Sequence, residues 1–265
     1  MSHLKAVQMY TLRKVISDKA SLTEALKKLK AIGYDGVQGG PAKGMTVQEY
    51  KDLLDSFGLK ECSTGGRLDA MAAGDVKTQV ENARILGVTE VSVGTLPREL
   101  QDRPEGFKAF AAQLNAAGKA LYDAAGLAVN YHNHALEFAS FGGGLMGMDI
   151  LFEETNPQYV HFTLDTHWVT AGGCSPAKWI RKAAGRIPNI HFKDYGINPA
   201  AVEIIEGVSK RFAEIGEGNI DWPEVVEACL SLNEIRAYIV EQDQCPGDPF
   251  DSLEISFKKL VSLGL

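Results

Sequence analysis

Residues 160–194, VHFTLDTHWVTAGGCSPAKWIRKAAGRIPNIHFKD, contain the pattern that decides the fold. An apolar run, VHFTLDTHW, is followed by SPAKWIRKAAG, which has the spacing of an amphipathic helix, and then by a second apolar run, NIHFKD. Short apolar runs that alternate with helical segments indicate β–α–β units, whose strands are parallel. This stretch therefore predicts two parallel strands joined by one helix.

The same alternation continues in both directions along the chain. Strand-like runs are expected at residues 6–10, 35–40, 59–64, 90–95, 127–134, 160–168, 189–194 and 237–243. Helical patterns are expected at residues 21–33, 46–58, 72–87, 105–126, 148–156, 175–185, 221–233 and 249–264.

The number of repeats selects the architecture. Eight strands that alternate with eight helices are the pattern of a closed (β/α)8 barrel, the TIM barrel. An open doubly wound sheet is the alternative, but no GxGxxG motif follows the first strand. We therefore predict an α/β fold in which residues 1–265 form a single TIM-barrel domain.

Composition excludes several classes of function. The net charge of −7 would repel a phosphate backbone, so nucleic acid is not an expected partner. The four cysteines form no CxxC pair, which argues against a structural zinc site and against a disulfide framework. No signal-peptide pattern opens the chain and no apolar run is long enough for a membrane span. We expect a cytoplasmic protein with reduced thiols, either monomeric or a homo-oligomer.

The strand ends carry the residues on which a functional prediction depends. A TIM barrel places its active site at the carboxyl ends of its strands, where residues i and i+2 share a face. His161, four residues before Asp165, is expected lower in the barrel as a packing residue. Four consecutive predicted strands finish with an ionisable pair of this kind: His132 and His134, Asp165 and His167, His191 and Lys193, and Glu241 and Asp243.

So many ionisable groups on one rim indicate a metal site. Burying them together is costly unless a divalent cation compensates the carboxylates. Histidine and carboxylate ligands without thiolates suit Mn²⁺, Co²⁺, Zn²⁺ or Mg²⁺. Among the other residues near strand ends, we expect substrate contacts from Tyr10, Gln38, His167 and Trp168, with Trp168 suited to an apolar sugar face.

The motifs resemble those of a known family. YHNHALEF, LDTHWVTAGG, HFKD, EIGEGNIDWP and IVEQD occur in this order, with VQMYTLR near the start. Together they resemble the sugar phosphate isomerase/epimerase proteins of the xylose isomerase-like barrel superfamily, over nearly the whole chain. The resemblance implies one divalent metal at the barrel mouth and a small-molecule sugar substrate.

The resemblance also implies which residues bind the metal. Asp165, His191 and Glu241 match three of the four ligand positions of the family. The first ligand of many relatives is a glutamate within the strand where this chain has His132 and His134. Glu137, just beyond, is therefore the expected fourth ligand, with His132 and His134 as alternatives.

The resemblance also implies a reaction class. A carboxylate removes a proton from the carbon beside a carbonyl whose oxygen the metal polarises. Glu241 is the expected base, and His132, His134 and Lys193 are candidates for the second proton transfer. An isomerase or epimerase is the main expectation. The alternatives are a lyase of the inosose dehydratase type, a non-catalytic sugar-binding barrel and an endonuclease IV-like enzyme, which would need more histidines and a basic face.

Overall fold

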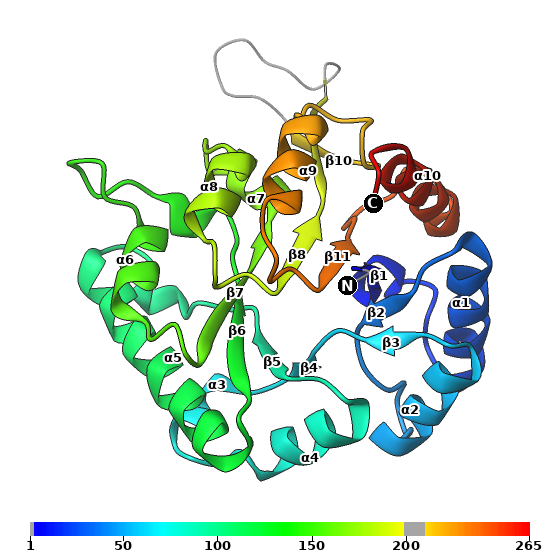
Figure 1. Cartoon of the computed structure of the whole chain (residues 1–265), viewed down its shortest axis with the longest axis horizontal. Helices are drawn as coiled ribbons and strands as arrows, with labels where there is room; N and C mark the ends of the chain where they lie inside the picture. The colour runs from blue at the N-terminus through cyan, green and yellow to red at the C-terminus, as the bar shows by residue number, and fades with distance from the viewer. Residues whose placement is uncertain (1–2, 199–209) are drawn as a thin grey trace.

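A computed structural model describes residues 3–198 and 210–265 and confirms the barrel. Strands lie at the centre and helices surround them (Figure 1). Within the described residues, nine parallel strands follow the order β3-β2-β1-β11-β8-β7-β6-β5-β4. These strands are β1 (Leu4–Gln8), β2 (Gly36–Gln38), β3 (Lys60–Glu61), β4 (Thr64–Gly65), β5 (Glu90–Val93), β6 (Ala128–His132), β7 (Val160–Asp165), β8 (Asn189–Phe192) and β11 (Ala237–Val240).

The third predicted strand is split into two pieces, and this split closes the ring. β3 pairs with β2, with Val37 opposite Glu61, whereas β4 pairs with β5, with Thr64 opposite Val91. The two pieces are separated by only two residues, so the chain itself joins the two edges of the sheet. The barrel therefore has eight strand positions, as predicted, although the third changes its partner halfway along.

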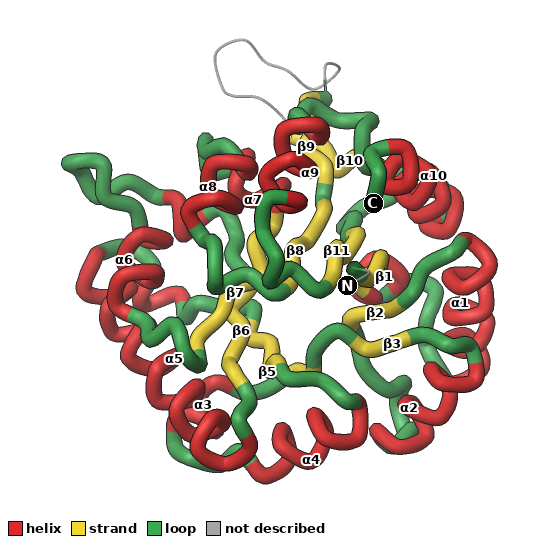
Figure 2. The backbone as a smooth tube through the Cα atoms, viewed as in Figure 1, coloured by secondary structure: helices red, strands yellow, loops and turns green. Residues whose placement is uncertain are grey.

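Helices cover the outside of the barrel, as the tube in Figure 2 shows. Cap signals explain several boundaries. Asp18 accepts a hydrogen bond from the Ser21 N–H at 2.8 Å, and the helix over Pro104–Ala125 is capped by Gly126, whose φ is 69°. No helix of the described residues is long and apolar enough to cross a bilayer. The helices are α1 (Lys19–Ile32), α2 (Val47–Ser56), α3 (Leu68–Ala72), α4 (Lys77–Leu86), α5 (Pro104–Ala125), α6 (Gly147–Glu154), α7 (Thr166–Ala171), α8 (Pro176–Lys182), α9 (Trp222–Leu230) and α10 (Pro249–Ser262), with the 3₁₀ turns η1 (Met9–Leu12), η2 (Arg98–Leu100) and η3 (Leu136–Phe138).

Alternate strand residues face the helices and the barrel interior. Tyr131 packs outward against Phe110 of α5, and Phe192 packs outward against Trp222 of α9, with ring centroids 5.0 and 4.9 Å apart. The intervening residues point inward, where the Thr163 hydroxyl donates to Asn130 Oδ1 at 2.8 Å. The apolar core therefore lies mainly between barrel and helices, and the interior beneath the strand ends is partly polar.

Two details differ from the sequence prediction. The strand expected at residues 160–168 ends at Asp165, because the Asp165 side chain accepts a hydrogen bond from the Trp168 N–H at 3.0 Å and starts α7. His167 is therefore helical and does not share a strand face with Asp165, which corrects that pairing. The antiparallel hairpin of β9 (Asp194–Ile197) and β10 (Lys210–Ala213) was not predicted.

Arg186, in the turn before β8, ties α6 to the start of β7. Its guanidinium donates to the carbonyl oxygens of Phe152, Thr155 and Val160, at 2.9, 3.3 and 2.8 Å. The side chain is buried, and burial lowers the pKa of Arg186 to about 10. Its acceptors include three backbone carbonyls, which would lose a buried donor if the guanidinium were removed.

We expect Arg186→Ala to lower the free energy of unfolding by about 3 kcal/mol, because it leaves buried carbonyl oxygens unpaired and creates a cavity. Arg181→Ala is the control, since Arg181 forms an exposed ion pair with Glu224 and should cost less than ~1 kcal/mol. Urea unfolding measures both. Equal effects of the two substitutions would contradict this role for Arg186.

Glu61 is buried at the split strand and holds α2 and the chain after β2 in place. Its carboxyl group accepts hydrogen bonds from the Tyr50 hydroxyl at 2.8 Å and the Gly39 N–H at 3.0 Å. Burial raises the pKa of Glu61 to about 7, although these hydrogen bonds oppose the rise. Between pH 4.5 and 7 the unfolded chain therefore loses this proton while the folded chain keeps it.

Stability should fall as the pH rises through this window, because the unfolded state binds fewer protons than the folded state. The Glu61 contribution is up to about 3 kcal/mol across the window. Glu61→Gln should remove that part of the slope, so the difference in unfolding free energy between variant and wild type should shift in favour of the variant from pH 5 to pH 8. A pH-independent difference in urea unfolding would contradict the assignment.

Candidate active site

A hollow of about 470 Å³ lies at the carboxyl ends of the strands. The histidines and charged residues that line it lie in or just after β6, β8 and β11. The lining residues from β1, β2 and the third and fourth strand positions are uncharged. The lining consists of Gln8, Tyr10, Gln38, Gly39, Ser63, Gly65, Ser92, Val93, Gly94, His132, His134, Trp168, His191, Lys193, Glu241 and Asp243.

Four side chains converge at the floor of this hollow. His132, Asp165, His191 and Glu241, the four-residue cluster, each offer one ligand atom, and these atoms lie within 4.8 Å of one another. His191 Nδ1 is 2.8 Å from Glu241 Oε2, and His132 Nε2 is 3.3 Å from Asp165 Oδ2. The structure thus brings together three of the ligands expected from the sequence, namely Asp165, His191 and Glu241.

The hydrogen bonds of His191 test whether these residues fit a metal ion. Its Nε2 donates to Gln38 Oε1 at 2.6 Å, and burial lowers the pKa of His191, which favours a neutral ring. Nδ1 then carries a lone pair 2.8 Å from a carboxylate oxygen of Glu241, and both atoms are buried without a hydrogen-bond partner. Two facing electron pairs of this kind fit a divalent cation as their common partner.

Glu137, the expected fourth ligand, occupies a different position. It lies in η3 after β6, where its carboxyl group binds the Tyr131 hydroxyl and accepts from the His134 N–H at 2.8 Å. Burial raises the pKa of Glu137. Because Glu137 is not in the four-residue cluster, the geometry favours the alternative ligand in the strand, His132.

Lys193 provides positive charge beside the cluster. Its Nζ lies 2.8 Å from Asp243 Oδ1 and 3.7 Å from both Asp165 Oδ2 and Glu241 Oε1. Burial favours the neutral amine, but the three carboxylates outweigh it and raise the pKa of Lys193. Burial also opposes ionisation of Glu241, and the nearby positive charge of Lys193 lowers the pKa of Glu241. Lys193 is therefore protonated at neutral pH and lies beside three carboxyl groups.

His134 and Trp168 form the upper part of the hollow. Their ring centroids are 5.5 Å apart. Burial, followed by the influence of His132, lowers the pKa of His134 to about 4, so its ring is neutral at pH 7. Lys210 of the unpredicted hairpin places Nζ 4.2 Å from the Trp168 ring centroid, and Tyr10 is 53% exposed at the rim.

His167, an expected substrate contact, is absent from the lining residues of the hollow. Its ring is buried, lies between Trp168 and Tyr195, and stacks on Phe212 with centroids 4.5 Å apart. Its Nδ1 is 2.8 Å from the carbonyl oxygen of Asp194 and donates to it. The structure therefore assigns His167 to the packing beneath the β9–β10 hairpin, because α7 turns it away from the strand face.

Sequence reasoning missed Ser92 and Asn133 of the site. Ser92 lies one residue before the end of β5, so the same strand-end rule could have selected it. Asn133 carried no such signal: its Oδ1 accepts a hydrogen bond from the Asp165 N–H at 3.0 Å and so fixes the end of β7.

Asp194 explains why HFKD and EIGEGNIDWP occur together. Its carboxylate accepts from the N–H groups of Gly216 and Gly218 at 2.8 and 3.1 Å, and from Trp222 Nε1 at 2.7 Å. A Cβ at Gly218 would lie 2.2 Å from Asp194 Oδ1. Residues of EIGEGNIDWP thus surround the Asp194 carboxylate of HFKD. These hydrogen bonds fix the backbone directly after His191 and Lys193.

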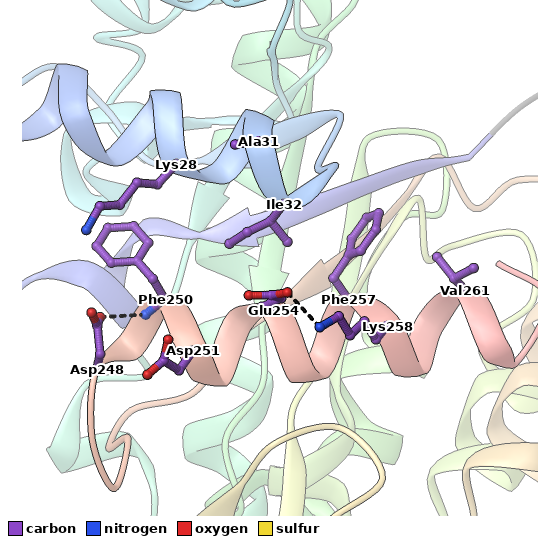
Figure 3. A pocket seen from close by; sticks show the side chains of 10 residues that line it. All are labelled: Lys28, Ala31, Ile32, Asp248, Phe250, Asp251, Glu254, Phe257, Lys258 and Val261. Carbon is purple, nitrogen blue, oxygen red and sulfur yellow. Dashed lines mark hydrogen bonds and ion pairs between the residues drawn. The ribbon is translucent and has the colours of Figure 1, made fainter.

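A second hollow, of about 650 Å³, lies between α1 and α10 on the outside of the barrel (Figure 3). Its side chains are engaged with one another: Lys28 lies over the Phe250 ring at 4.3 Å, and Glu254 pairs with Lys258 at 2.6 Å. The four-residue cluster is not part of it. The site with catalytic potential is therefore the barrel mouth.

The chain belongs to the xylose isomerase-like TIM barrel family, which its residues 26–244 match. The fold and the position of the site at the barrel mouth agree with this membership. The resemblance inferred from the motifs is thereby confirmed.

Among curated proteins, inosose dehydratase of Salmonella agona (strain SL483) is 29% identical over 146 residues, 50% of this chain and 45% of the relative. The chain thus spans about half the length of the curated relatives it matches.

Two solved structures share the fold. A sugar phosphate isomerase/epimerase from Parabacteroides distasonis ATCC 8503 has a TM-score of 0.76 at 21% identity, over 98% of this chain and 94% of the other. The IolI protein with a bound zinc atom has a TM-score of 0.67 at 16% identity, over 98% and 97%.

We predict that His132→Ala loses most Co²⁺ binding and that Glu137→Gln retains it, because His132 faces the other three ligands and Glu137 does not. His161→Ala is the matched histidine control, since His161 lies lower in the barrel, 3.2 Å from Glu90. Titration of metal-free protein with Co²⁺, followed by visible absorbance, measures the affinities. Loss of Co²⁺ in Glu137→Gln with retention in His132→Ala would instead identify Glu137 as the ligand.

Proposed function

We propose that the protein is a divalent-metal-dependent sugar isomerase or epimerase. The observation that carries this proposal is the four-residue cluster beside the protonated Lys193 at the floor of the mouth. Family membership supports a carbohydrate substrate, and the zinc atom of the related IolI protein supports a metal cofactor. The proposed ligands are His132, Asp165, His191 and Glu241, and the cofactor is one Mn²⁺, Co²⁺, Zn²⁺ or Mg²⁺ ion.

When bound, the ion acts as a Lewis acid that makes the hydrogen beside a carbonyl group acidic. The protein supplies the groups that move protons. Glu241 belongs to the four-residue cluster, lines the hollow and is our proposed base. His134 and Lys193 line the same hollow and are our candidates for returning a proton to the neighbouring carbon or to the opposite face.

The uncharged side of the hollow indicates which substrates fit. Gln8, Gln38, Ser63 and Ser92 offer amide and hydroxyl groups, and glycines leave open space between them. Among the described lining residues, the only Lys or Arg is Lys193, and three carboxylates surround it. These groups suit the hydroxyls of a neutral keto sugar or cyclic polyol better than a phosphate ester.

A dehydratase of the inosose dehydratase type is the second candidate. The similarity to the Salmonella enzyme favours it, and Lys193, which pairs with Asp243 in the hollow, is our candidate for protonating a departing hydroxyl group. The first step, removal of a proton beside a carbonyl, is common to both reactions. The products differ, because a dehydratase releases water and an isomerase or epimerase keeps the mass of its substrate.

We expect turnover in D₂O to place deuterium on the carbon next to the carbonyl, or to move the original hydrogen between carbons, as seen by NMR. Panels of keto sugars and inososes serve as substrates, and mass spectrometry of the product detects loss of water. Asp243→Asn is informative for comparison, since it should reduce the rate by weakening the hold on Lys193 while exchange continues.

Glu241→Gln should abolish exchange even in excess metal, because a carboxamide cannot accept the proton. The His161→Ala variant should exchange as wild type, since His161 lies lower in the barrel, beside Glu90. Product formed with every carbon-bound hydrogen kept in place would exclude this reaction class and indicate hydrolytic chemistry.

A further inference from the structure

We infer that Gln38 is a positioning residue that sets the metal-binding tautomer of His191 and, through the same amide, orients the hydroxyls of Ser63 and Ser92 for the substrate. The inference rests on the metal site of the proposed function. Gln38 is the last residue of β2 and is only 6% exposed. The amide of Gln38 therefore has little contact with water, and its hydrogen-bond partners in the protein determine its orientation.

The Gln38 amide lies at the centre of one hydrogen-bonded chain. Its Oε1 accepts from Gln8 Nε2 at 2.7 Å and from His191 Nε2 at 2.6 Å. Its Nε2 donates to Ser63 Oγ at 2.8 Å, and Ser63 Oγ lies 2.8 Å from Ser92 Oγ. A single side chain thus joins a proposed metal ligand to two hydroxyl groups on the uncharged side of the hollow.

The direction of this chain is fixed at a backbone group. The Tyr10 N–H donates to Gln8 Oε1 at 3.2 Å, which leaves the Gln8 amide nitrogen as the donor to Gln38. Gln38 must then present its oxygen to both Gln8 and His191. Because a backbone N–H is always a donor, the order of donors and acceptors cannot reverse without breaking a bond.

The consequence for His191 is a defined tautomer. An oxygen that only accepts requires the proton of the neutral ring on Nε2, so the lone pair is on Nδ1. Nδ1 is the nitrogen that faces Glu241, at 2.8 Å, and Asp165, at 4.0 Å. Gln38 thereby prepares the ring for a cation before the cation binds.

The same chain of hydrogen bonds makes the Ser92 hydroxyl a hydrogen-bond donor toward the substrate. Ser63 Oγ accepts from Gln38, so its own hydrogen is free for Ser92 Oγ. The Ser92 hydroxyl hydrogen then remains available to an oxygen of the substrate in the hollow, which Ser92 lines. With a glutamate at position 38, both serine hydroxyls would have to reverse, because a carboxylate only accepts.

Three variants separate the two roles in Co²⁺ titrations of the metal-free full-length protein. Gln38→Met keeps the length of the side chain but removes both polar ends, and we expect its Co²⁺ affinity to fall about 10–100-fold. Gln38→Glu keeps the acceptor for His191, and we expect an affinity within about threefold of wild type or tighter. Ser92→Ala, the control on the substrate side, should bind Co²⁺ as wild type.

A second measurement reads the tautomer directly. In ¹⁵N-histidine-labelled metal-free protein, the His191 Nε2 signal should be that of a protonated nitrogen in wild type and Gln38→Glu, and should move toward a mixture of tautomers in Gln38→Met. Gln8→Leu, which leaves His191 and Gln38 in place, should shift the signal in the same direction by less. This variant keeps the test valid if Gln38→Met fails to fold.

Wild-type Co²⁺ affinity in Gln38→Met, or an equal loss in Gln38→Met and Gln38→Glu, would overturn the inference. An absence of Co²⁺ binding in wild type would overturn it together with the metal site. If the variants follow the expected order but no keto sugar or inosose is turned over, the proposed reaction fails while the role of Gln38 stands.

Discussion

The structure depends on keeping two carboxylates, Asp165 and Glu241, ionised and close together out of contact with water. Desolvation opposes this arrangement, and mutual repulsion between the two adds to the cost. Lys193 offsets part of this cost, and a divalent ion held by the four-residue cluster would offset the rest. The hydrogen bond between His191 and Gln38 then decides which ring nitrogen carries the proton and which presents a lone pair to the carboxylates.

Much of the remaining architecture holds these groups in position. Asn133 fixes the end of β7 through the Asp165 N–H, and Asp194 gathers the residues 216–222 around the end of β8. Arg186 secures the other end of β7 through backbone carbonyls. Each of these groups is buried, and Asn133 and Asp194 lie just after β6 and β8, where a small shift of the backbone would displace a member of the cluster.

The alternation of strands and helices and the closed barrel were predictable from the sequence, because hydrophobic periodicity is a local signal. Strand-end position is a local signal too, and it selected the rim on which the candidate site lies. The convergence of Asp165, His191 and Glu241 was accessible through motif resemblance. Three features were not. The start of α7 depends on an Asp165 side chain that caps a helix, so His167 was wrongly paired with it. The preference for His132 over Glu137 depends on where η3 turns after β6. The split of the third strand depends on its two neighbours, β2 and β5.

Asp165 divides its two oxygens between different tasks. Oδ1 accepts the Trp168 N–H at the start of α7, and Oδ2 faces His132 in the cluster. The Asp165 carboxylate therefore has two roles. It fixes the backbone of Trp168, whose indole lies over the hollow, and it contributes to the cluster at the floor of the hollow. A glutamate at position 165 would move both carboxylate oxygens by the length of one methylene group. It would therefore disturb both the hydrogen bond to Trp168 and the contact with His132. Redesign of this barrel for another substrate would for this reason have very little freedom at β7, because one substitution there changes the floor and the cover of the hollow together.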